Sequence, residues 1–260
     1  MVEHSSERMT IAGCEIELLR GGSGPALVFL HGAGGAHNWM PYMDRLAEHY
    51  SLYVPSHPGW GRSDTPDWLD GIGDLAYFYL DFLGQLGLED AVVIGASFGG
   101  WIAAELAIRR TPRMAKLVLI DALGIRLGDR TTRDIADFHN TDAALLESLK
   151  WADPAGRQGD PSKLSDSELA GMIRSREAFA HYGWRPYMHN PGLARWLHRV
   201  NVPSLVLWGE EDGVVKPDYG QAYAGLIGDA TFEAVPAAGH YPHIEQADAS
   251  TKIVRAFIDS

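Results

Sequence analysis

Short runs of apolar and β-branched residues alternate along this chain with longer stretches in which apolar residues recur at helical spacing. Runs of the first kind predict β-strands, and stretches of the second kind predict amphipathic α-helices. The predicted strands cover residues 10–13, 15–19, 26–30, 51–55, 91–95, 116–121, 204–208 and 231–235. The predicted helices cover residues 39–49, 74–86, 99–111, 217–227 and 247–258. This alternation is typical of the α/β class, and it predicts an eight-stranded, mostly parallel sheet with helices on both faces.

The first two predicted strands differ from the other six. The turn residues Ala12 and Gly13 divide them, which predicts an antiparallel hairpin at one edge of the sheet. The later strands are continuous apolar runs, a pattern typical of parallel strands that are buried on both faces.

About eighty residues between the sixth and seventh predicted strands break this alternation. They contain helical patterns at residues 134–149 and 165–181. We therefore expect residues 123–200 to form a helical cap (lid) subdomain and residues 1–122 and 201–260 to form the core. The same segment is rich in aromatic residues. Aromatic side chains can line an apolar pocket or build the core of a small cap, so we expect only about half of these residues to contact a ligand. The candidate pocket residues are Trp151, Tyr182, Trp184, Tyr187, Met188 and Tyr241.

The composition limits the range of partners. The chain has 260 residues, of which 46% are hydrophobic, and a formal net charge of −12. Its 22 basic residues are scattered without a run, so we expect neither nucleic acid nor an anionic membrane as a partner. The expected partner is a small-molecule substrate, and the sequence does not define an oligomeric state.

Cysteine usage and the absence of long apolar runs point to a cytoplasmic protein. Cys14 is the only cysteine, which makes an intramolecular disulfide or a thiolate metal cluster impossible. The first residues are polar and lack the apolar core of a secretory signal. The longest apolar runs are far shorter than the roughly 20 residues that span a bilayer.

The strongest chemical motif is Gly95-Ala96-Ser97-Phe98-Gly99-Gly100, which follows an apolar strand and precedes a helix. A nucleophilic serine is found on such strand-to-helix turns in hydrolases. The turn is so tight that side chains two positions before or after the serine would collide with neighbouring backbone, and Gly95 and Gly99 avoid this collision. We therefore predict that Ser97 is a nucleophile.

A second glycine-rich turn, His31-Gly32-Ala33-Gly34-Gly35, follows the third predicted strand. Acyl transfer requires two preorganised donors for the oxyanion of the tetrahedral intermediate. In the geometry typical of these turns, the residue after the nucleophile gives one donor and this loop gives the other. We assign the two donors to the backbone N–H groups of Phe98 and Ala33.

A serine requires a base, and the base requires a group that orients it. His240 follows the last predicted strand in a loop of small residues, and His243 is the nearby alternative. Asp212 follows the seventh predicted strand, and we prefer it to Glu210 and Glu211, which we expect to be solvated. The predicted catalytic residues are therefore Ser97, Asp212 and His240, whereas His31 and His57 are interpreted as structural residues.

With these motifs, the chain resembles the α/β-hydrolase superfamily over nearly its whole length. The stretches that carry the resemblance are residues 28–35, 58–63, 95–100, 208–212 and 239–246. The loop before the second stretch usually contains an aspartate in that family, whereas this chain has Ser56 and His57, and we expect this difference to alter loop anchoring rather than catalysis. Dehalogenase and epoxide-hydrolase relatives have an aspartate at the position of Ser97, so the serine argues against both activities.

These features predict a carboxylesterase-like serine hydrolase that cleaves esters of small to medium, largely apolar substrates through an acyl-enzyme, without a cofactor or metal. A carbon–carbon bond hydrolase resembling the meta-cleavage-product enzymes is a second hypothesis, although those enzymes commonly have tryptophan where this chain has Tyr241. A hydroxynitrile-lyase-like enzyme and a ligand-binding receptor with vestigial hydrolysis are also compatible with these residues, since fold and catalytic residues do not determine the reaction.

Overall fold

The computed structural model describes residues 2–36, 38–129, 131–155 and 161–260. The strands are β1 (His4–Ile11), β2 (Cys14–Gly21), β3 (Ala26–Leu30), β4 (Ser51–Pro55), β5 (Ala91–Ala96), β6 (Met114–Ile120), β7 (Ser204–Gly209) and β8 (Ala230–Val235). The α-helices are α1 (Pro41–Ala47), α2 (Ile72–Gln85), α3 (Phe98–Ile108), α4 (Ala143–Lys150), α5 (Asp166–Gly183), α6 (Leu193–Trp196), α7 (Pro217–Gly225), α8 (Pro242–Glu245) and α9 (Ala247–Ile258). Two short 3₁₀ helices are η1 (Pro161–Lys163) and η2 (Leu197–Arg199).

The strands form one sheet in the order β1-β2-β4-β3-β5-β6-β7-β8. β2 is antiparallel to β1 and to β4, and the remaining neighbours are parallel. The predicted eight-stranded, mostly parallel sheet is thereby confirmed. Because β5 lies between β3 and β6 and all three are parallel, the loops that follow these strands meet at their carboxyl ends.

The edge hairpin is longer than predicted. β1 begins at His4, six residues before the predicted start, and its first five residues are exposed. A strand at the edge of a sheet pairs along one side through its backbone, so it forms without the apolar side chains on which the prediction relied. Ala12 and Gly13 form the turn with φ values of 48° and 79°.

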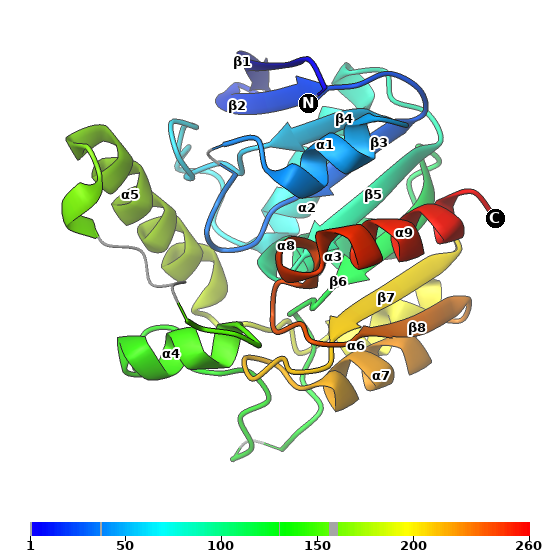
Figure 1. Cartoon of the computed structure of the whole chain (residues 1–260). Helices are drawn as coiled ribbons and strands as arrows, with labels where there is room; N and C mark the ends of the chain where they lie inside the picture. The colour runs from blue at the N-terminus through cyan, green and yellow to red at the C-terminus, as the bar shows by residue number, and fades with distance from the viewer. Residues whose placement is uncertain (1, 37, 130, 156–160) are drawn as a thin grey trace.

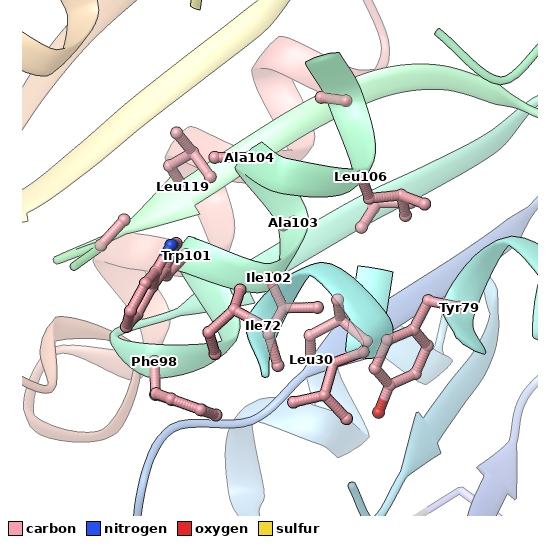
Figure 2. Packing of buried hydrophobic residues seen from close by; sticks show 14 of the residues in the cluster. Leu30, Ile72, Tyr79, Phe98, Trp101, Ile102, Ala103, Ala104, Leu106 and Leu119 are labelled. Atoms are coloured by element: carbon pink, nitrogen blue, oxygen red, sulfur yellow. The ribbon is translucent and has the colours of Figure 1, made fainter. Parts of the chain in front are cut away.

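Apolar side chains cover both faces of the sheet. One buried cluster includes Phe78 of α2, Ile102 of α3 and Tyr223 of α7. The other includes Met43 of α1 and Val254 of α9. Figure 2 shows how α3 is embedded in the first cluster, with Phe98, Trp101, Ile102 and Leu106 packed near Leu30, Ile72 and Tyr79. This burial fixes the start of α3, directly after Ser97.

The inserted segment (residues 123–200) contains α4, η1, α5, α6 and η2. The predicted helix at residues 134–149 is wrong in its first half, because α4 begins only at Ala143. The carboxylate of Asp137 accepts the N–H groups of His139 and Asn140, and the carboxylate of Asp142 caps α4. Aspartate side chains compete in this way with helical backbone hydrogen bonds, so they favour turns and N-caps over helix interiors.

α4 and α5 lie on the side of the sheet toward which the arrowhead of β7 points (Figure 1). From α5, Phe179 contacts Phe98 with ring centroids 5.4 Å apart, and Tyr182 stacks on Trp60 at 5.9 Å. Arg174 donates to the carbonyl of Ser63 at 2.6 Å. The inserted segment therefore packs on the loops at the carboxyl ends of the strands. No helix among the described residues is both long and apolar enough to cross a membrane.

Candidate active site

Ser97 occupies a sharp turn between β5 and α3. Its φ of 54° and ψ of −114° lie in a strained region for a residue with a side chain. A Cβ on Gly95 would lie 2.4 Å from the carbonyl oxygen of Gly99, and a Cβ on Gly99 would lie 2.1 Å from that of Leu30. Glycine at both positions is therefore a steric requirement of the turn.

The structure brings Ser97, His240 and Asp212 into one hydrogen-bonded chain. The Nε2 atom of His240 is 2.8 Å from the Oγ atom of Ser97, and its Nδ1 atom is 2.8 Å from the Oδ2 atom of Asp212. The side chains of His240 and Asp212 are fully buried. Because a carboxylate can only accept, the proton of the neutral ring lies on Nδ1 and Nε2 accepts from the serine hydroxyl.

Asp212 is fixed by its own loop. Its Oδ1 atom accepts the N–H groups of Val214 at 2.8 Å and Val215 at 3.1 Å. Glu210 and Glu211 are exposed, as predicted, whereas Asp212 is buried. Asp212 is therefore held in place by backbone donors of its own loop.

The C-terminal end of α4 contacts both loops of this hydrogen-bonded chain. The carbonyl of Leu149 accepts the N–H of Gly213 at 3.0 Å, and the carbonyl of Lys150 accepts the N–H of His240 at 2.8 Å. The last carbonyls of a helix have no partner within the helix, so they are available for such bonds. The carboxylate of Glu245 adds a further link, because it accepts the N–H groups of Gly239 at 2.7 Å and Ala152 at 3.1 Å.

The loop that follows β3 lies against Ser97. A Cβ on Gly32 would lie 3.3 Å from the Cβ atom of Ser97. The indole of the buried Trp60 donates to the carbonyl of Ala33 at 2.9 Å and so restrains the peptide that follows the predicted donor N–H of Ala33. Phe98 is the first residue of α3, where a backbone N–H has no acceptor inside the helix.

His31 and His57 are both buried and form a hydrogen-bonded network with each other. The backbone N–H of His57 donates to the Nε2 atom of His31 at 3.0 Å, and the Nε2 atom of His57 contacts the carbonyl of His31 at 2.8 Å. The Nδ1 atom of His57 pairs with the hydroxyl of Tyr79. Burial lowers the pKa of His57 to about 3. This ring is therefore neutral at physiological pH and joins two loops.

His243, the alternative base, lies beneath the same loops. Its ring packs against Phe29 and Tyr42, with centroid distances of 5.6 Å and 4.9 Å. Burial, followed by the nearby His240, lowers the pKa of His243 to about 3. The Ser97 hydroxyl donates its hydrogen bond to His240, so the geometry favours His240 as the base.

A cavity of about 770 Å³ adjoins Ser97. Its lining includes Gly32 and Ala96 beside the serine, and two of the predicted pocket residues, Trp151 and Tyr241. The Trp151 and Tyr241 rings contact each other at 4.8 Å between centroids. Both predicted residues therefore line the cavity beside Ser97.

The other four predicted pocket residues do not line this cavity. Tyr182 stacks on Trp60 and, with the half-exposed Trp184, borders a separate cavity near α2. The hydroxyl of Tyr187 pairs with the backbone of residues 136 and 138, and Met188 is fully buried. Aromatic composition alone does not indicate which face of a segment meets the core, and here these side chains mainly pack the inserted segment against its neighbours.

Three charged side chains of the inserted segment line the cavity, and none was predicted. The ammonium of Lys150 pairs with the carboxylate of Glu147 at 2.7 Å, and Arg176 of α5 adds a second cation. Two cations against one carboxylate give this wall a net positive charge in a protein whose net charge is −12. The signal in the sequence was that Lys150 and Arg176 lie next to apolar residues in the two helical patterns of the inserted segment.

The sequence interpretation also missed Asp121. This carboxyl is fully buried, and one nitrogen or oxygen atom from each of Asp121, Asp212 and His240 lies within 4.8 Å of the others. The signal was an acid at the carboxyl end of a predicted strand, and β6 lies between the strands that lead to Ser97 and Asp212.

The arrangement has the parts of a nucleophilic site. His240 can accept the Ser97 proton, and Asp212 can stabilise the resulting imidazolium. Phe98 directly follows Ser97 in the chain, and Gly32 of the His31–Gly35 turn lies against it, so both segments with the predicted oxyanion donors adjoin Ser97.

Known proteins resemble this chain both in sequence and in fold. A family model described as the alpha/beta hydrolase fold matches residues 25–247. The dihydrolipoyllysine-residue acetyltransferase component of the acetoin cleaving system of Cupriavidus necator is 28% identical over 241 residues, covering 88% of this chain. The chain spans 62% of that relative's length.

Two further proteins match over nearly their full lengths. The 2-hydroxymuconate semialdehyde hydrolase of a Pseudomonas strain is 27% identical over 265 residues, which is 95% of this chain and 91% of that protein. The crystal structure of a serine hydrolase from the polyaromatic-hydrocarbon-degrading bacterium Cycloclasticus zankles superimposes with a TM-score of 0.82 at 19% identity, covering 99% of this chain and 98% of that chain.

Proposed function

This chain belongs to the α/β-hydrolase fold family, and on that premise we propose that it is a serine hydrolase that cleaves carboxylic esters through an acyl-enzyme. The observation that supports the proposal most directly is the hydrogen-bonded chain from Ser97 through His240 to Asp212. It connects the Ser97 hydroxyl, whose neighbours Gly32 and Ala96 line the cavity, to a buried carboxylate through a single imidazole.

In the proposed reaction, His240 removes the proton of Ser97 as the serine oxygen attacks the ester carbonyl. The N–H groups of Ala33 and Phe98 stabilise the oxyanion of the tetrahedral intermediate. The C–O bond to the alcohol then breaks, and the imidazolium of His240 gives its proton to the leaving oxygen. A water molecule, deprotonated by His240, attacks the acyl-enzyme and releases the acid and the Ser97 hydroxyl.

We propose that residues 123–200 act as the cap over this site, with α4 and α5 providing one wall of the substrate cavity. The opposite wall carries Phe29, Tyr42 and Ile244, which suit an apolar acyl or alcohol group. The cavity volume of about 770 Å³ is within the usual range for small-molecule sites.

A second candidate is hydrolysis of a carbon–carbon bond next to a ketone by the same three residues. The observation that favours it is the cationic wall formed by Lys150 and Arg176, which could bind a substrate carboxylate. The relative from Pseudomonas is named a 2-hydroxymuconate semialdehyde hydrolase, a name that denotes a carboxylate substrate.

The experiment that tests the proposal measures turnover of p-nitrophenyl esters of increasing acyl length by the purified protein and by Ser97→Ala. We expect multiple turnovers, with kcat lowered at least about a thousandfold in Ser97→Ala. Ser204→Ala is the matched control, because Ser204 is also buried but begins β7 at the opposite end from the site. Its kcat should remain within about twofold of the unmodified protein.

A synthetic 2-hydroxy-6-oxo-dienoate assayed in parallel separates the two candidates. A kcat/KM for this substrate more than about a hundredfold above that of the best ester would replace the esterase proposal by the carbon–carbon candidate. Labelling of Ser97 by a fluorophosphonate without turnover of any substrate would support a ligand-binding role, and absence of labelling would refute Ser97 as the nucleophile.

A further inference from the structure

A second buried carboxyl lies behind the residues of the proposed site. Asp121 directly follows β6 and has no solvent exposure. Its φ of 45° is uncommon for a residue other than glycine, and its N–H donates to the carbonyl of Leu207 at 3.0 Å. The backbone therefore directs this side chain toward the end of β7, where the Asp212 loop begins.

The hydrogen bonds of Asp121 leave one of its oxygens without a donor. Its Oδ1 atom accepts the N–H of Gly209 at 3.0 Å. Its Oδ2 atom is buried, and none of the residues that the structure describes donates to it. The carboxyl of Asp212 lies beside it among the described residues, since an oxygen of each of the two carboxyls lies within 4.8 Å of the other. Two ionised carboxylates cannot share such a site at acceptable cost, so one of the pair holds a proton.

The partners of the two carboxyls indicate which one is protonated. Asp212 accepts three hydrogen bonds, two from Val214 and Val215 and one from His240. Asp121 accepts one. Hydrogen bonds donated to a carboxylate stabilise its charged form, so the negative charge belongs on Asp212 and the proton on Asp121.

The titratable groups around Asp121 act in the same direction. Burial, then the charge of Asp212, raises the pKa of the Asp121 carboxyl well above its usual range, and Glu245 adds to the effect. Tyr241, which also faces this pair, has its pKa raised by burial and so stays neutral. His240 is a further titratable neighbour among the described residues, and its Nδ1 proton is directed at Asp212.

We propose that Asp121 is a positioning residue: its protonated carboxyl donates a hydrogen bond to the Asp212 carboxylate and so fixes the position and basicity of the group that orients His240. This inference rests on the proposed function, since it assigns a role within the same site. The donated bond disperses part of the Asp212 charge, which limits how strongly Asp212 stabilises the imidazolium of His240.

The test compares Asp121→Asn with Asp121→Ala. Asparagine can accept from Gly209 through its oxygen and donate to Asp212 through its Nδ2 atom, so it mimics a neutral aspartic acid. Asp121→Asn should retain kcat within about threefold, and the acidic limb of its kcat/KM profile should stay within about 0.3 pH unit. Asp121→Ala should lower kcat about tenfold and shift that limb upward by about 0.5 to 1 pH unit, because Asp212 then interacts more strongly with the imidazolium.

Two results would overturn the inference. A downward shift of about one pH unit in Asp121→Asn would mean that an ionised neighbour had been removed, so Asp121 carries a charge. Loss of thermal stability in both variants with no shift of either profile would mean a purely structural role.

An infrared difference spectrum between the unmodified protein and Asp121→Asn separates this inference from the proposed function. At neutral pH we expect the C=O band of a protonated carboxylic acid to disappear in the variant. If the band is absent from the unmodified protein, Asp121 is ionised and the inference fails even if ester turnover is normal. If the band is present but no substrate is turned over, the pH dependence of the His240 ring measured by ¹⁵N NMR replaces the kinetic profile, with the same expected shifts.

Discussion

At the scale of single residues, the proposed site depends on contacts that lie far apart in the sequence. The motifs around Ser97, Asp212 and His240 were sufficient to predict which side chains meet, because each motif follows the carboxyl end of a predicted strand. Asp121 and Trp60 were not identified. Their importance comes from hydrogen-bond partners 88 and 27 residues away, which no local pattern reveals.

Trp60 provides a prediction at this scale. Trp60→Phe keeps an aromatic ring in the core but removes the donor to the carbonyl of Ala33, so the proposed oxyanion loop loses a restraint. We expect kcat for the best substrate to fall about three- to tenfold, as for the loss of one hydrogen bond. Trp101→Phe is the control, because among the described residues the buried indole N–H of Trp101 has no acceptor. Equal kcat values in the two variants would contradict a restraining role for Trp60.

At the scale of secondary structure elements, hydrophobic periodicity predicted the central strands and most helices near their observed positions. It failed where polar side chains determine structure: β1 extends into an exposed polar stretch, and α4 begins late because aspartates form turns before it. The aromatic-rich composition of the inserted segment, in turn, assigned Tyr182 and Met188 to the pocket, and neither lines the cavity beside Ser97. Periodicity indicates that a face is apolar, but the neighbour that covers this face depends on the tertiary arrangement.

α4 provides a prediction at this scale, because its last carbonyls accept from the loops of both Asp212 and His240. Asp142→Ala removes the side chain that caps α4, at an expected cost of about 1 kcal/mol in stability. We expect kcat to fall several-fold, since the carbonyls of Leu149 and Lys150 lose their fixed position. Ser165→Ala removes the corresponding cap of α5 at a similar cost in stability, and α5 makes no such bonds in the described residues. A kcat that falls equally in both variants would show that α4 has no special role.

At the scale of the whole molecule, buried titratable groups connect folding to pH. Burial lowers the pKa values of His57 and His243 from 6.5 to about 3. In the unfolded chain these rings take up protons near pH 6.5, whereas in the folded protein they remain neutral until much lower pH. Their contribution to stability is therefore complete above about pH 6.5 and is lost as the pH falls toward 3. Asp121 changes stability in the opposite direction. Because its pKa is raised in the folded protein, its contribution to stability is lost as the pH rises.

Comparison with His243→Phe isolates one of these contributions, because Asp121 and His57 are unchanged in the variant. Between pH 6.5 and about pH 5, the unmodified protein should lose on the order of 2 kcal/mol of unfolding free energy more than His243→Phe does. The measurement is urea-induced unfolding of both proteins at the two pH values. Parallel losses in the two proteins would mean that His243 is protonated in the folded state.

The bonds from the end of α4 also bear on how this protein can diversify. The segment that forms one wall of the cavity is the same segment that fixes the loops of Asp212 and His240. A chimaera that receives a foreign inserted segment would therefore acquire a new alignment of Asp212 and His240 together with a new lining of the cavity. Exchange of α5 alone leaves the carbonyls of Leu149 and Lys150 in place. We therefore expect substitutions that change the substrate range to be tolerated best in α5. The last turn of α4 should be retained, because its carbonyls hold the loops of Asp212 and His240.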